Sequence, residues 1–146
     1  MTHDHGDQDH DAAWEAQLAL GFGAMDHDHR QQARAVAALE GAVRRGGDPQ
    51  VIASLLLGLI ESTHEHFESE QRLMRRWNYP LYEAHAHSHE RLMGELRVIR
   101  DEHAAGQLVI DAARLAALRR WLTDHIRAMD HALAEFLKQR EETREA

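Results

Sequence analysis

The sequence of 146 residues contains no cysteine, which excludes disulfide bonds, thiolate zinc sites and cysteine-ligated iron–sulfur clusters. Proline is nearly absent, with two residues, and the many Ala, Leu, Glu and Arg residues favour helices. The longest strongly apolar run, Val51 to Ile60, is too short to span a bilayer. The N-terminus is acidic and polar and lacks the apolar stretch of a signal peptide, so we expect a cytoplasmic protein.

Basic residues are also too few to suggest a nucleic-acid-binding protein. Asp and Glu total 25 against 17 Lys and Arg, and a net charge of −8 would repel phosphate groups. An apolar content of 43% in a chain of this length is typical of one globular domain. The unusual feature is histidine, with thirteen residues against three Phe and two Tyr. We therefore expect neither nucleic acid nor a membrane as a partner, and we expect imidazole to carry the function.

The ends of the chain differ in composition from its middle. Residues 1–13 are rich in His and Asp, and we expect them to form a mobile acidic tail. Trp14 and Leu18 then begin a short apolar arm, interrupted by Gly21 and Gly23, that we expect to pack on the main domain with Trp14 as its anchor. Residues 14–140 form the predicted domain, and the highly charged residues 141–146 are expected to fray.

Apolar residues recur at helical spacing in four segments, which predicts an all-α fold. Asp48 and Asp111 are expected N-caps, Pro49 suits a first turn, and Asn78 and Gly106 lie where helices should stop. The connections are short, so we predict an up-down-up-down antiparallel four-helix bundle with an N-terminal arm. The predicted helices begin near residues 24–26, 49, 81 and 111, and they end near residues 44–47, 77, 103–105 and 140.

Polar groups interrupt the apolar stripes of these helices. His66 and Glu70 are four residues apart and therefore share one helix face with apolar neighbours. An imidazole and a carboxylate in such a place must be paired or bound to a metal, because an isolated buried charge is costly. His85 and His89 have the same spacing, which is typical of two metal ligands on one helix face.

Asp130 follows His125 by five residues, a poor same-face spacing on an ideal helix. Either the carboxylate reaches round to a shared ion, or the helical turn is locally widened. His29 lies near the start of the first predicted helix, and the antiparallel topology brings all these groups to the same end of the bundle. Five imidazoles and two carboxylates exceed the needs of one ion and suit two bridged ions of iron, manganese or zinc. The predicted metal ligands are His29, His66, Glu70, His85, His89, His125 and Asp130.

With these motifs the chain resembles the hemerythrin family, specifically the single-domain bacterial hemerythrins, from Trp14 to about Phe136. All seven ligand positions match the family in identity and order. Gln71 is a departure, because the family usually has a second glutamate there, but it is not a ligand position. The motifs that carry the resemblance are Asp-His-Asp-His at 26–29, His-Phe-Glu-Ser-Glu at 66–70, Tyr79-Pro80 followed by His85 and His89, and Trp-Leu-Thr-Asp-His-Ile at 121–126 with Asp130.

The resemblance implies reversible dioxygen binding, for oxygen transport, storage or delivery, at a centre of two non-haem iron ions with an oxo or hydroxo bridge. Leu122 and Trp121, one turn or less before His125, would line the oxygen pocket and exclude water. The resemblance also implies how the ligands are divided. One iron would be bound by His85, His89 and His125, and the other, which keeps an open position, by His29 and His66. Glu70 and Asp130 would bridge the two irons.

Other functions fit the sequence less well or stay open. A ferritin-like oxidase needs two Glu-x-x-His motifs, and only Glu61 to His64 fits. A metallophosphohydrolase built on His27, Asp28 and Asp130 would leave five imidazoles unexplained. A di-iron enzyme or sensor acting on peroxide or nitric oxide in the same fold is the alternative that stays open. Because no general base remains once the ligands are assigned, we expect a protein without enzymatic activity. We also expect a monomer, with an oxygen-consuming enzyme as a candidate partner.

Overall fold

The computed structural model describes residues 11–106 and 110–145, with side chains described as far as Arg140. Residues 1–10 of the tail that was expected at residues 1–13 lie outside the described part, as do the side chains of residues 141–146, where fraying was expected. Within the described part no strand occurs, and no helix is long and apolar enough to cross a bilayer. Residues 11–17 are helical, and the elements that follow are α2 (Gly23–Arg44), α3 (Pro49–Arg76), α4 (Tyr82–Ala104), α5 (Ala112–His125), the π-helical turn η1 (Ile126–Asp130) and α6 (His131–Glu145).

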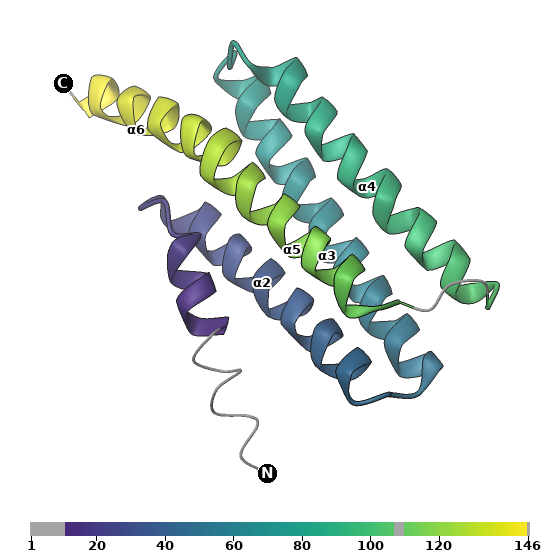
Figure 1. Ribbon diagram of the computed structural model, residues 1–146. Helices are drawn as coiled ribbons and strands as arrows, with labels where there is room; N and C mark the ends of the chain where they lie inside the picture. The colour runs from purple at the N-terminus through teal and green to yellow at the C-terminus, as the bar shows by residue number, and fades with distance from the viewer. Residues whose placement is uncertain (1–10, 107–109, 146) are drawn as a thin grey trace.

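The helices form an antiparallel bundle (Figure 1). The helices α2, α3 and α4 alternate in direction, and α5, η1 and α6 together form the fourth rod, which runs back beside α2. The predicted all-α, up-down-up-down bundle is confirmed. The last rod continues to Glu145, so its backbone stays helical beyond the end expected near Arg140.

The polar residues expected at the helix starts make the predicted contacts. The Asp48 side chain accepts a hydrogen bond from the backbone N–H of Gln50 at 2.7 Å, with Pro49 in the first turn of α3. The Asp111 side chain accepts one from the backbone N–H of Arg114 at 2.8 Å. Each bond satisfies a backbone donor that has no partner within the helix. Both predicted N-caps are therefore confirmed.

The helix ends are marked by left-handed backbone. Gly46 has φ of 63° after α2, Gly106 has φ of 69° after α4, and Asn78 has φ of 51° after α3. Glycine adopts this region without steric cost, and asparagine tolerates it better than most residues. The backbone N–H of Gly47 then bonds to the carbonyl of Ala42 at 2.9 Å, which satisfies an acceptor at the end of α2. Short turns between helices follow, and they require the antiparallel arrangement.

The apolar core of the bundle consists of two clusters of buried side chains. The larger one includes Leu39, Leu56 and Leu96, and the smaller one includes Met74 and Leu133. A layer of buried histidine and carboxylate side chains belongs to neither cluster. Burial of apolar side chains in the two clusters supplies the main driving force for folding. The polar layer therefore does not need to stabilise the fold.

The N-terminal arm packs on the bundle through Trp14. The buried indole Nε1–H donates to Thr123 Oγ1 at 2.7 Å, and the guanidinium carbon of Arg119 lies 3.9 Å from the ring centroid. Leu18, one turn later, is buried in the larger apolar cluster. The helix at residues 11–17 includes positions 11–13, which the sequence analysis assigned to the tail.

Candidate metal centre

The polar layer contains all seven predicted ligand residues. The helices α3 and α4 each supply two of them, and α2, α5 and η1 supply one each. Every one of these side chains belongs to a residue that is at most 5% exposed. Buried imidazole and carboxylate groups are costly unless they are paired or coordinate an ion. The seven residues are His29, His66, Glu70, His85, His89, His125 and Asp130.

The ligand atoms of these residues fall into two overlapping groups, in each of which all atoms lie within 4.8 Å of one another. Glu70 and Asp130 belong to both groups. Two carboxylates shared between two sets of imidazoles form the pattern expected for a pair of bridged ions. Besides the carboxylates, one group contains His85, His89 and His125, and the other contains His29 and His66.

A local change in helix geometry aligns Asp130 with the cluster. The segment η1 (Ile126–Asp130) is a π-helical turn between two α-helices of the same rod. A π-turn pairs residue i with i+5, so residues five apart come to lie one above the other. The Nε2 atom of His125 is accordingly 3.2 Å from Oδ1 of Asp130. Of the two explanations open from sequence, the structure has the widened turn.

The atoms that face one another in the layer lack hydrogen-bond partners. This holds for Nε2 of all five histidines, for both oxygens of Glu70 and for Oδ1 of Asp130, within the part of the chain described. The Nε2 of His66 is 2.6 Å from Glu70 Oε2, and that of His85 is 2.8 Å from Asp130 Oδ1, but neither contact has hydrogen-bond geometry. Buried polar atoms are nearly always paired, so this set fits a metal site.

The two carboxylates shift the protonation of their neighbours. Burial by itself would lower the pKa of His66, but the charge of Glu70 and the hydrogen bond to Asp28 outweigh it and raise the pKa to about 10. Burial acts the same way on His85, where Asp130 and Glu70 raise the pKa to about 9.

The carboxylates themselves stay ionised. Burial would raise the pKa of Glu70, but the charge of His66 and contacts with further imidazoles hold it well below its usual value. The pKa of Asp130 is also lowered, because the charge of His125 and its contacts outweigh burial and the repulsion from Glu70. Without an ion, the layer is therefore held together by imidazolium–carboxylate pairs.

An anionic residue orients one imidazole of the smaller group. The Nδ1 atom of His66 lies 2.9 Å from Oδ2 of Asp28, and in the tautomer that leaves Nε2 free it donates to that oxygen. The hydrogen bond to His66 outweighs burial and lowers the pKa of Asp28, so the carboxylate stays charged. Such a partner fixes the ring and strengthens the imidazole as a ligand.

Neutral residues orient two imidazoles of the larger group. The Nδ1 atom of His89 lies 3.2 Å from Oε1 of Gln71, and that of His125 lies 2.9 Å from Oγ of Ser88. Gln71, noted from sequence only as a departure from the family, thus supports a predicted ligand. Sequence reasoning missed the roles of Ser88 and Asp28, since each acts on a histidine of another helix. Their positions just before His89 and His29 were the only signal available.

Aromatic rings cover two of the histidines. Phe67 stacks on His89 with ring centroids 3.7 Å apart and planes 4° apart, and Trp121 stacks on His125 at 4.8 Å and 9°. Leu122 is buried in the larger apolar cluster. Parallel stacking of this kind shields an imidazole face from water and holds its orientation.

The comparisons with known proteins point to one family. Residues 20–137 match the model of the hemerythrin HHE cation binding domain. A bacteriohemerythrin of Pseudomonas paraeruginosa (strain DSM 24068 / PA7) is 28% identical over 137 residues, covering 88% of each chain. A myohemerythrin of Sipunculus nudus is 29% identical over 117 residues, covering 80% of this chain and 86% of its own. A crystal structure of wild-type hemerythrin superposes with a TM-score of 0.77 at 25% identity, covering 82% of this chain and 92% of its own.

Proposed function

Because the chain belongs to the hemerythrin family, we propose that it binds dioxygen reversibly at two non-haem iron ions joined by an oxo or hydroxo bridge. The observation that carries this proposal is the unequal pair of ligand groups that share Glu70 and Asp130. The similarity to proteins named bacteriohemerythrin and myohemerythrin, over at least 80% of each chain, supports the proposal. When bound, the two ions supply the reversible electron transfer that dioxygen binding requires.

The donor count favours one closed and one open ion. The group with His85, His89 and His125 offers five protein donors, one from each of three imidazoles and one from each of the two carboxylates. The group with His29 and His66 offers four. A shared bridge adds one donor to each, so a six-coordinate ion would be complete in the first group and would keep a free position in the second. A small ligand would bind beside His29 and His66.

The surroundings of the centre favour binding over turnover. Phe67 and Trp121 cover imidazole faces, and Leu122 adds buried apolar surface, so water is kept from the ligands. Trp121 and Leu122 are the proposed lining of the oxygen pocket, and Trp121 stacks on His125 of the larger ligand group. If all seven imidazole and carboxylate side chains of the cluster are ligands, none of them is left to act as a general base. We therefore propose a carrier without enzymatic activity. We further propose that it is a cytoplasmic monomer that supplies dioxygen to an oxygen-consuming enzyme.

The test is reconstitution with Fe²⁺ under anaerobic conditions, followed by iron analysis and absorption spectra before and after exposure to air. We expect two irons per chain and a spectral change in air that reverses when oxygen is removed. His66→Ala should abolish the reversible change, and His64→Ala, at an exposed histidine on the same helix, should preserve it. Sustained consumption of peroxide or nitric oxide without reversible oxygenation would instead favour the same-fold enzyme.

A further inference from the structure

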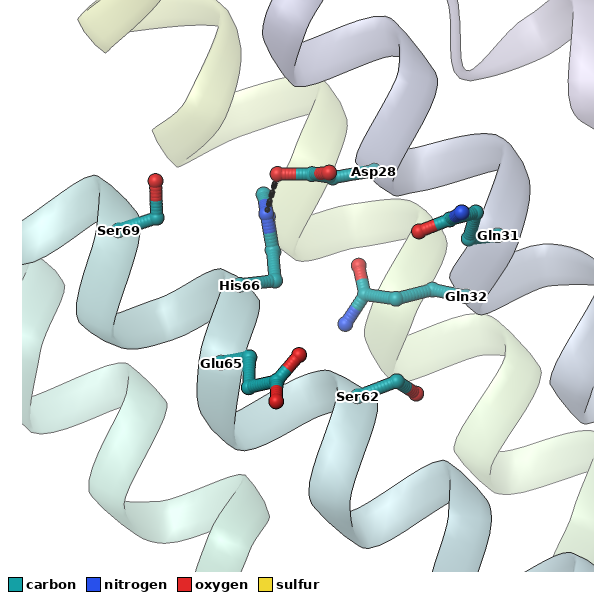
Figure 2. A pocket seen from close by; sticks show the side chains of 7 residues that line it. All are labelled: Asp28, Gln31, Gln32, Ser62, Glu65, His66 and Ser69. Carbon is teal, nitrogen blue, oxygen red and sulfur yellow. Dashed lines mark hydrogen bonds and ion pairs between the residues drawn. The ribbon is translucent and has the colours of Figure 1, made fainter.

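The metal centre is closed to solvent, so an ion must cross the wall of the bundle to reach it. One cavity of about 230 Å³ lies against this wall, between α2 and α3 (Figure 2). His66 lines the cavity and also belongs to the smaller ligand group, so its imidazole connects the two spaces. The residues that line the cavity are Asp28, Gln31, Gln32, Ser62, Glu65, His66 and Ser69.

The lining offers oxygen atoms to a cation. Asp28 and Glu65 carry carboxylates, and Glu65 is exposed at the surface. Gln32 is 2% exposed, and its amide oxygen has no hydrogen-bond partner among the described residues. Figure 2 shows Gln32 extending from α2 into the space bounded by Asp28, Glu65 and His66. A buried amide oxygen without a partner is costly, and a passing divalent ion or its water would satisfy it.

The lining of this cavity carries two carboxylates and no Arg or Lys side chain. Arginine, which would repel a divalent cation, is missing from its lining. Trp121, which covers His125, lines one of the other cavities. Another is lined by the ligand His89 with Phe67, and by the carboxylates of Glu68 and Glu90 together with Arg97. Arginine side chains line other cavities in the described part of the chain, namely Arg119 and Arg120 in one, Arg91 and Arg114 in another, and Arg97 in the one beside His89.

We propose that the cavity between α2 and α3 is the port through which divalent metal ions enter the centre. Glu65 attracts the ion at the exposed mouth, and Gln32 supplies an oxygen ligand inside. Asp28 holds His66 at the inner wall, from which the ion passes to the group of His29 and His66. This inference rests on the proposed metal centre and adds its loading route.

The port is tested by the rate at which metal-free protein binds Co²⁺, followed by stopped-flow absorption at low ionic strength. Glu65→Gln should slow uptake about five-fold, because it removes one of two carboxylates from the passage. Glu68→Gln removes the same charge one turn away, at the cavity lined by Arg97, and should change the rate less than about 1.5-fold. Both variants should bind the wild-type amount of Co²⁺ at equilibrium.

A second pair of variants tests the passage by adding charge. Ser69→Lys introduces an ammonium into the lining and should slow uptake at least about ten-fold. Ser54→Lys adds the same charge at an exposed position of α3 outside this lining and should leave the rate nearly unchanged. Equal slowing by both members of either pair, or by neither, would overturn the port and leave the metal centre intact. Failure of wild-type protein to bind Co²⁺ at all would overturn the centre, and the port with it.

Discussion

Metal binding at this centre should release protons, because imidazoles of the ligand cluster are protonated when no ion is bound. Without an ion, His66 has a pKa of about 10 and His85 a pKa of about 9, so at pH 7.5 each is more than about 95% protonated. A metal ligand must be neutral at Nε2, so both protons must leave. Glu70 and Asp130 are already ionised and release none. We therefore expect at least about two protons per chain on full loading.

The measurement is calorimetric titration of metal-free protein with Co²⁺ at pH 7.5 in buffers of different ionisation enthalpy. The slope of the observed enthalpy against the buffer enthalpy gives the number of protons released. His85→Asn should reduce the slope by about one proton, because that variant has one fewer imidazolium to neutralise. A wild-type slope below about one proton would refute the description of the metal-free layer as imidazolium–carboxylate pairs.

The same pKa shifts predict that the stability of the metal-free protein and its affinity for metal change in opposite directions with pH. In the metal-free protein the folded-state pKa of His66 and of His85 lies above the unfolded value of about 6.5. Their stabilising contribution is therefore complete below about pH 6.5, and it is lost as the pH rises through about 9 and about 10. Metal affinity should instead increase over that range, because protons compete with the ion. Urea denaturation at several pH values, with and without metal, checks both signs.

Three further outcomes are expected. Glu70→Ala should lose metal from both positions, because it removes a shared carboxylate, whereas His29→Ala should retain about one ion per chain; elemental analysis showing equal loss would contradict the division of ligands. Gln71→Glu should strengthen the partner of His89 and lower the reduction potential of the loaded centre; an unchanged potential in voltammetry would show that Gln71 only fills space. Trp14→Ala should cost about 3–5 kcal/mol of unfolding free energy, because the indole is buried; a loss below about 1 kcal/mol in chemical denaturation would mean that the arm is not part of the core.

Local patterns in the amino-acid sequence are enough to predict the four helical rods and the seven polar residues that meet between the apolar clusters. Helical periodicity is local: His66 with Glu70, and His85 with His89, share a face because four residues make about one turn. The N-caps Asp48 and Asp111 act within three residues of themselves, so their patterns are also readable from the chain. Short turns then forced the antiparallel order that brings the four helices' polar residues to one level.

Features that depend on how the helices face one another could not be predicted and become visible in the folded chain. The sequence left two explanations for the spacing of His125 and Asp130, because a π-turn has no sequence pattern that distinguishes it from an α-helix. The partners Asp28, Ser88 and Gln71 each reach a histidine on another helix. Such contacts depend on the rotation and separation of packed helices, which periodicity does not specify. The cavity between α2 and α3 arises in the same way, from residues of two helices that meet only in the folded chain.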